Sequence, residues 1–291
     1  MNAAVILMAY GSPATAEDVP AYLAEIREGG PVSQVAIDEL TERYRRIGGH
    51  SPLDEITEAQ RAALEHELGL PVFVGMKHWR PRVAEAVEAA LADGAETLVG
   101  LVLAPHYSRL SIAGYRDRLE QALHGRAGLV FVESWHDHGP FLDVLAERVR
   151  GFDRHVVFTA HSLPERILQD GDPYRDQLLE TSRLVAERAG LDDWSFAFQS
   201  ASPTGEPWLG PDILEELDTL AANGVRRVLV CPVGFVSDHL EILWDLDIEA
   251  REKAAELGLE LERIESLNDD PQFVRALGGI AGKALSIPSQ A

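Results

Sequence analysis

The 291-residue sequence contains one cysteine, Cys231, which excludes an internal disulfide and a cluster held by several cysteines. Cations are also scarce, since 26 Lys and Arg stand against 48 Asp and Glu, a formal net charge of -22. Such a surface repels phosphate backbones and anionic lipids, so we expect neither nucleic acid binding nor membrane insertion. No apolar run reaches the roughly 18 residues of a membrane helix, and no basic signal-peptide region precedes the strand-like start. A cytoplasmic protein is therefore expected.

Short apolar runs typical of strands alternate with longer amphipathic segments along the chain. The runs predicted to be strands are residues 4–9, 71–76, 97–105, 129–134, 155–161, 194–200, 227–233 and 259–264. Helical patterns such as 16–29, 58–69 and 174–190 lie between them. This alternation is typical of βαβ units, so the predicted fold class is α/β with parallel sheets and helices on both faces.

The two halves of the chain resemble each other. VILMAYGSP near the start matches VVFTAHSLP in the middle, and VGLVLAPHYS matches VLVCPVGFVS. We interpret these matches as an old duplication that gave two similar domains. One is expected to comprise residues 1–140 plus a C-terminal helix at about 270–291, and the other residues 141–269. Ligands of parallel sheets bind beyond the carboxyl ends of the strands, so we expect a site in the cleft between the domains.

The segment SDHLEILWDLDIEAREKA carries Glu241, Asp245 and Glu249 at positions i, i+4 and i+8 of a predicted helix capped by Ser237 or Asp238. Like charges at this spacing repel each other, and a solvated acidic face is the usual explanation. The interleaved apolar residues favour a second interpretation, a buried row of carboxylates that needs protons or a divalent metal. Spacing alone does not decide between them.

Other residues at strand ends have two interpretations each. His161 follows an apolar strand, where an imidazole either completes a crowded turn or binds a metal and accepts protons. Lys77 and His78 lie either in a surface loop or against an anionic ligand. Aromatic residues at strand ends and in loops are more often core, but together they could line a slot for a flat molecule. No phosphate-binding loop, dinucleotide fingerprint or nucleophile elbow is present.

Five motifs together resemble the ferrochelatases: MAYGSP, RYRRIGGHSPL, TAHSLPERI, EPWLGPD and VGFVSDHLEILWD. Their order and spacing match from Val5 to about Ala276. The tyrosine of MAYG makes the chain most similar to the bacterial coproporphyrin ferrochelatases, which insert iron into coproporphyrin III. The resemblance implies two Rossmann-like, chelatase-type domains with the porphyrin between them.

The resemblance also implies roles for particular residues. His161 and Glu241 correspond to the catalytic, metal-handling pair, and Tyr10 to an axial contact of the metal. Asp245 and Glu249 correspond to a row that holds an accessory divalent metal. Contacts to the macrocycle and its propionates correspond to Tyr10, Arg27, Arg43, Tyr44, Ser51 and Tyr115. Relatives often have a second basic residue where this chain has Glu28, which puts one propionate contact in doubt.

The expected reaction is the insertion of Fe(II) into coproporphyrin III to give coproheme, with release of two protons. Fe(II) is then a substrate, no resident cofactor is required, and the single cysteine argues against an iron–sulfur cluster. A monomer is expected, with a coproheme decarboxylase as the acceptor of the product. The alternatives are a protoporphyrin IX ferrochelatase, another tetrapyrrole metal chelatase, and a non-catalytic porphyrin carrier.

Overall fold

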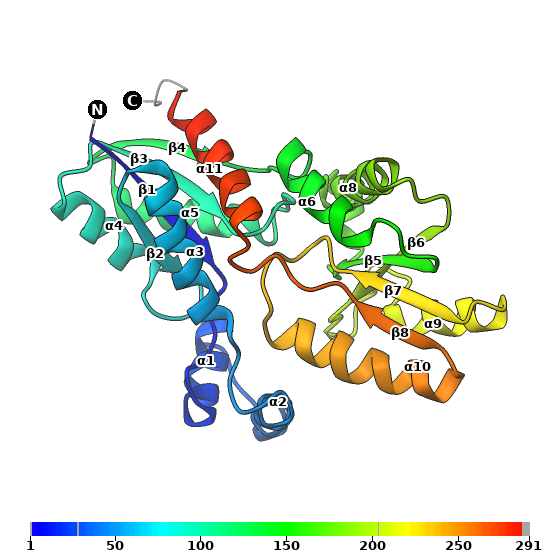
Figure 1. The fold of residues 1–291 in the computed structure, drawn as a ribbon. Helices are drawn as coiled ribbons and strands as arrows, with labels where there is room; N and C mark the ends of the chain where they lie inside the picture. The colour runs from blue at the N-terminus through cyan, green and yellow to red at the C-terminus, as the bar shows by residue number, and fades with distance from the viewer. Residues whose placement is uncertain (1, 28, 203, 287–291) are drawn as a thin grey trace.

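A computed structural model describes residues 2–27, 29–202 and 204–286, and it contains two parallel sheets. Figure 1 shows them in the two halves of the molecule. The strands of the first sheet are β1 (Ala3–Ala9), β2 (Val72–Met76), β3 (Thr97–Val102) and β4 (Gly128–Val132). Those of the second are β5 (His155–His161), β6 (Trp194–Gln199), β7 (Arg227–Cys231) and β8 (Glu260–Arg263). All eight predicted strands therefore exist.

The two sheets have the same topology. Their strand orders are β2-β1-β3-β4 and β6-β5-β7-β8, so in each half the first strand lies between the second and the third. Val5 of β1 pairs with Val72 and Val99, and Val156 of β5 pairs with Trp194 and Leu229. In each sheet the second strand lies on one side of the first strand, and the third and fourth strands lie on the other side. The strand order therefore changes direction beside β1 and β5, and ligands of parallel sheets bind at such positions.

Helices connect the strands and cover both sheets. The α-helices are α1 (Val19–Ile26), α2 (Gln34–Arg46), α3 (Leu53–Leu68), α4 (Val83–Ala92), α5 (Ile112–Leu123), α6 (Gly139–Val149), α7 (Arg166–Gln169), α8 (Tyr174–Ala189), α9 (Ile213–Ala222), α10 (Arg251–Leu257) and α11 (Pro271–Leu285). A 3-10 helix, η1 (Ala16–Asp18), precedes α1, and a π-helix, η2 (Ile242–Ala250), precedes α10. None of the helices in the described ranges is long and apolar enough to cross a membrane.

Alternate residues of the central strands pack against different helices, because successive side chains of a strand point to opposite faces. In β1, Ile6 and Met8 join a core cluster with α4 and α5, while Val5 and Leu7 join a cluster with α3 and α11. These four side chains are fully buried, and each such burial contributes roughly 1.5–3 kcal/mol. Burial on both faces explains why the central strands β1 and β5 are nearly continuous apolar runs.

One core cluster continues from the first sheet into the second. It contains Leu7 of β1 and Phe158 of β5, together with Phe141 of α6 and Phe273 of α11. After β8 the chain returns to the first half, where α11 packs beside α3, as Figure 1 shows. The division at residues 140/141 and 269/270 stays a prediction, and residues 287–291 of its last segment lie outside the described residues.

The structure differs from the sequence-based expectation at the acidic helix. Asp238 does not cap it, because its carboxylate accepts hydrogen bonds from Ser266 (2.6 Å) and Asn268 (3.0 Å) and pairs with Arg263 (3.2 Å). The helix that follows is a π-helix over Ile242–Ala250. Single π-helical turns occur frequently at functional sites.

Candidate active site

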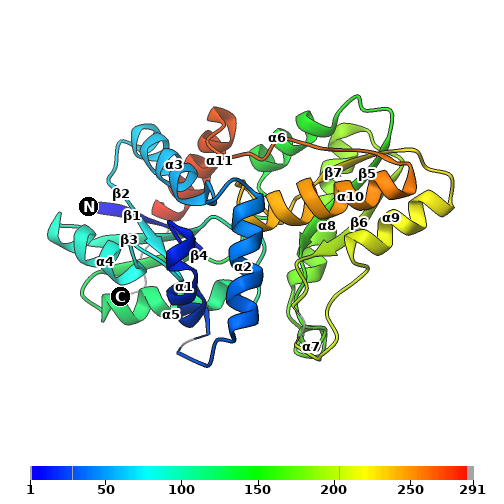
Figure 2. The ribbon, with the colours of Figure 1, turned by 90° about the horizontal axis from the view of Figure 1, so that it is seen from below.

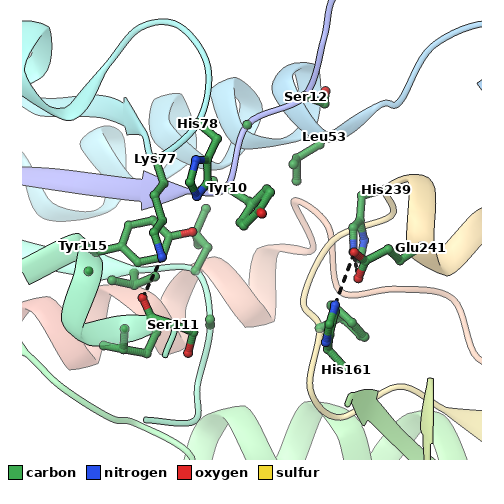
Figure 3. Close-up of a pocket in the computed structure, with 18 of the residues that line it drawn as sticks. Tyr10, Ser12, Leu53, Lys77, His78, Ser111, Tyr115, His161, His239 and Glu241 are labelled. Atoms are coloured by element: carbon green, nitrogen blue, oxygen red, sulfur yellow. Dashed lines mark hydrogen bonds and ion pairs between the residues drawn. The ribbon is translucent and has the colours of Figure 1, made fainter. Parts of the chain in front are cut away.

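Two strand ends place aromatic rings beside one cavity. Tyr10 directly follows β1, and His161 is the last residue of β5, at the matching position of the repeated sequence. Gly11 has φ +87°, and a Cβ there would meet the Cβ of Trp79 at 2.8 Å, so only glycine allows the chain to turn at this point. Figure 3 shows Tyr10 and His161 separated by the open space of the cavity.

His161 and Glu241 form an ion pair, with the imidazole Nε2 3.5 Å from the carboxylate Oε1. Their side chains are 30% and 34% exposed. The Nδ1–H of His161 donates to the carbonyl oxygen of Ser162. Because a carbonyl only accepts, Nδ1 carries a proton and the proton at Nε2 is the exchangeable one.

The charges of this pair fix its protonation states. Burial alone would lower the pKa of His161, but the negative charge and hydrogen bond of Glu241 raise it above its usual value. Burial opposes ionisation of Glu241, yet the charges of His161 and His239 hold its pKa well below the usual range. The second carboxylate oxygen of Glu241 lies 3.7 Å from His239 Nε2. The resting site is therefore an imidazolium–carboxylate pair at neutral pH.

Tyr10 is 43% exposed, and its ring centroid lies 4.6 Å from that of His78. Desolvation and the charge of Glu241 raise the pKa of Tyr10, which keeps its hydroxyl protonated. Burial, followed by the charges of Lys77 and Arg118, lowers the pKa of His78 to about 4. Tyr10 therefore presents a neutral oxygen to the cavity beside a neutral imidazole.

The cavity has a volume of about 790 Å³, within the range of about 300–1,000 Å³ typical of small-molecule sites. Six of the ten residues to which the resemblance assigned roles line it: Tyr10, Tyr44, Ser51, Tyr115, His161 and Glu241. The others are not among the described lining residues: Arg27, Arg43, Asp245 and Glu249. Aromatic rings and the His161–Glu241 pair thus surround one space.

The two predicted propionate-binding arginines have other partners. Arg27 donates to the carbonyl oxygen of Pro31 (2.8 Å). The guanidinium of Arg43 lies 5.3 Å from the Trp244 ring centroid, and Arg46 lies 5.1 Å from the same ring. Figure 2 shows α2 beside α10, where Arg46 also pairs with Glu252 (2.5 Å). Glu28 lies outside the described residues.

Asp245 is 6% exposed and is not among the described lining residues of the cavity. Its carboxylate accepts hydrogen bonds from Ser200 and, at 3.4 Å, from Gln199. Burial and the charges of Glu241 and Glu249 raise the pKa of Asp245 to about 7. In the described ranges, no group of three or more His, Cys, Asp or Glu side chains could hold a metal ion. The accessory metal row at Asp245 and Glu249 therefore stays a prediction.

Sequence reasoning missed several residues of the site. Tyr174 donates from its hydroxyl to the carbonyl oxygen of His161 (2.9 Å) and so fixes the end of β5. Arg109 and Arg118 line the cavity from the loop after β3 and from α5. The signal for Arg118 was its position three residues after Tyr115, which places both on one face of a helix. Nothing in the local sequence distinguishes Arg109 or Tyr174.

Comparison with solved structures identifies the class of fold. The structure titled "SirB from Bacillus subtilis with Fe3+" superposes with a TM-score of 0.61 at 11% identity, over 98% of this chain and 96% of that one. The sheets and their flanking helices thus form a chelatase-type fold.

The family follows from sequence comparison. Residues 2–285 match the family model described as Ferrochelatase. The chain is 45% identical to a ferrochelatase of Deinococcus radiodurans, over 95% of this chain and 94% of the relative. It is 40% identical to the coproporphyrin III ferrochelatase of Geobacillus thermodenitrificans, over 97% and 96%. The chain belongs to the ferrochelatase family, whose reaction makes Fe(II) and a porphyrin its substrates.

Proposed function

We propose that the chain inserts Fe(II) into coproporphyrin III and that His161 and Glu241 receive the protons displaced from the ring. The observation that carries this proposal is the position of Tyr10 across the cavity from the His161–Glu241 pair (Figure 3). A flat ligand in this space would have a phenol on one side and an ion pair on the other. The name of the Geobacillus relative supports coproporphyrin as the ring.

The reaction must remove two pyrrole N–H protons while Fe(II) forms bonds to the ring nitrogens. In the resting pair, Glu241 is the available proton acceptor, since His161 is protonated. A divalent cation that arrives beside the pair repels the imidazolium proton and lowers the pKa of His161. His161 releases this Nε2 proton to solvent, and the vacated Nε2 then becomes the second acceptor. Two pyrrole protons leave the ring as one Fe(II) enters, so the charge of the ring balances.

Asp245 provides an exit for these protons. Its carboxylate lies one helical turn after Glu241, and with a pKa of about 7 it can both take up and release a proton near neutral pH. Glu249, one further turn along, continues the row toward the surface. We propose the same two carboxylates as the place where an accessory divalent metal would bind.

The experiment that tests this function is anaerobic insertion of Fe(II), followed by absorbance, with coproporphyrin III and protoporphyrin IX in parallel. We expect faster turnover of coproporphyrin III and a loss of at least about 100-fold in His161→Ala. The matched control is His66→Ala, which removes an exposed imidazole from α3 and should leave the rate unchanged.

The other outcomes are equally informative. Preference for protoporphyrin IX would overturn the proposed substrate and retain the activity of the family. Equal rates for wild type and His161→Ala would refute the role of the ion pair. Binding of both rings without insertion of iron would support the porphyrin carrier instead.

A further inference from the structure

The cavity is electrically asymmetric. Within the part of the chain that the structure describes, its charged Lys, Arg, Asp and Glu lining residues are Lys77, Arg109, Arg118, Asp117 and Glu241. The three cations all come from the first half: Lys77 follows β2, Arg109 lies in the loop after β3, and Arg118 belongs to α5. Glu241, at the start of the π-helix, belongs to the second half. Figure 3 shows Lys77 and Glu241 on opposite sides of the space.

Hydrogen bonds position Lys77 and the backbone of Arg109. Lys77 Nζ donates to the carbonyl oxygen of Ser111 (3.0 Å) and lies 4.9 Å from the Tyr115 ring centroid. A Cβ at Gly114 would lie 3.1 Å from the same Nζ, so the glycine leaves room for the ammonium group. The backbone N–H of Arg109 donates to Asp172 Oδ2 (2.7 Å), which fixes the loop that carries it.

The positive charge of this region acts on its neighbours. Besides burial, the charges of Lys77 and Arg118 lower the pKa of His78. Arg118 also opposes the rise that burial causes in the pKa of Tyr115. The chain as a whole has a net charge of -22, but these three cations with one nearby acid, Asp117, give this part of the cavity a positive net charge. Low-dielectric walls strengthen such a field inside a cavity.

We propose that Lys77, Arg109 and Arg118 form a cationic wall that binds carboxylates on the edge of the tetrapyrrole and orients its ring. The inference rests on the proposed function, because it takes a tetrapyrrole as the ligand. It assigns carboxylate binding to residues other than Arg27 and Arg43, whose side chains lie outside the cavity lining. Coproporphyrin, a tetracarboxylate, gains more from such a wall than protoporphyrin, a dicarboxylate.

The wall also separates the two substrates by charge. Carboxylates are drawn toward the cations of the first half, whereas a divalent metal is repelled from them and attracted to Glu241. The ring would therefore bind with its carboxylates toward the first half and leave Glu241 accessible to the metal. Guanidinium groups suit this task because they form paired hydrogen bonds with carboxylates.

The test is a fluorescence titration of metal-free coproporphyrin III and its neutral tetramethyl ester. Arg118→Gln should weaken binding of the acid about fivefold to tenfold and leave binding of the ester within twofold. The matched control is Arg116→Gln on the same helix, because Arg116 pairs with Glu120 (2.8 Å) and Glu133 (2.5 Å) and is not a lining residue. Arg118→Lys, which keeps the charge, should recover most of the affinity.

Three results would contradict the proposed cationic wall. They are wild-type affinity of Arg118→Gln for the acid, an equal loss of affinity for the acid and the ester in Arg118→Gln, and an equal loss of affinity for the acid in Arg116→Gln. Circular dichroism shows whether a variant has lost affinity because it is unfolded. If Arg118→Gln is unfolded, Arg109→Gln takes its place in the titrations with the acid and the ester. Since the titration needs no metal, it tests the wall even where insertion fails. Wild-type preference for protoporphyrin IX in the insertion assay would refute the proposed function without affecting the titration.

Discussion

Gly234 offers a sharp test of how the sheet positions His161. A Cβ on Gly234 would lie 2.4 Å from the Cβ of Ala160 and 2.8 Å from its Cα, and Ala160 directly precedes His161. Ordinary contact begins near 3.4 Å, so Gly234→Ala must displace β5 or the following loop by about 1 Å. Both contacts involve buried, rigid atoms, and overpacking of this kind costs about 1–3 kcal/mol.

The displacement should also lower the rate of metal insertion. His161 lies 3.5 Å from Glu241, and a shift of about 1 Å in such a pair can cost roughly 100-fold in rate. We expect Gly234→Ala to lose activity by that order while remaining folded, as measured by initial insertion rates and urea unfolding.

Gly282→Ala is the matched control for this variant. Gly282 lies in α11 with no neighbouring atom within 4 Å of an added Cβ, so alanine there should stabilise the protein by about 0.5–1 kcal/mol. Activity of Gly234→Ala within twofold of wild type, with unchanged stability, would refute the reasoning.

Three further predictions concern neighbouring groups. Tyr174→Phe removes the hydroxyl that donates to the His161 carbonyl oxygen (2.9 Å); unfolding in urea should show a loss of about 1 kcal/mol, with a lower kcat. Gln60→Leu removes the buried amide that donates to Ser237 Oγ (3.0 Å), and the free energy of unfolding should fall by about 1–3 kcal/mol. Burial raises the pKa of Asp54 from 3.8 to about 6, so the folded protein retains a proton that the unfolded chain releases. The stability from this group is present below pH 3.8 and is lost as the pH rises through 6. Asp54→Asn should flatten that part of the profile of Tm against pH.

Gln60→Leu and Asp54→Asn each have a matched control on the surface. Gln34→Leu and Asp93→Asn change exposed residues, and we expect both to alter stability by less than about 0.5 kcal/mol. A wild-type kcat in Tyr174→Phe would show that its hydrogen bond does not position His161. An unaltered pH profile in Asp54→Asn would contradict the assignment of that slope to this carboxyl group.

The strands and the family were predictable from the sequence because both depend on local patterns. Continuous apolar runs predict strands buried on both faces, and the matching strand ends place Tyr10 and His161 correctly beside one cavity. The expected pair of similar α/β halves is confirmed by the identical strand orders of the two sheets.

The features that sequence reasoning missed depend on long-range contacts. Arg43 and Arg46 lie in α2, and their positions are set by Trp244, about 200 residues away. The π-helix arises from a shift in backbone hydrogen bonding that side-chain periodicity does not reveal. Ser237 or Asp238 was expected to cap a helix, but the carboxylate of Asp238 instead binds Ser266, Asn268 and Arg263, which follow β8 or end it.

The matching positions of Tyr10 and His161 have a consequence for the symmetry of the cavity. Two identical subunits related by symmetry must present the same residue to both faces of a ligand bound between them. Here the corresponding strand ends belong to one chain, so a substitution after β1 leaves β5 unchanged. One side of the cavity can therefore carry a phenol and the other an imidazole, a difference that two identical subunits cannot present.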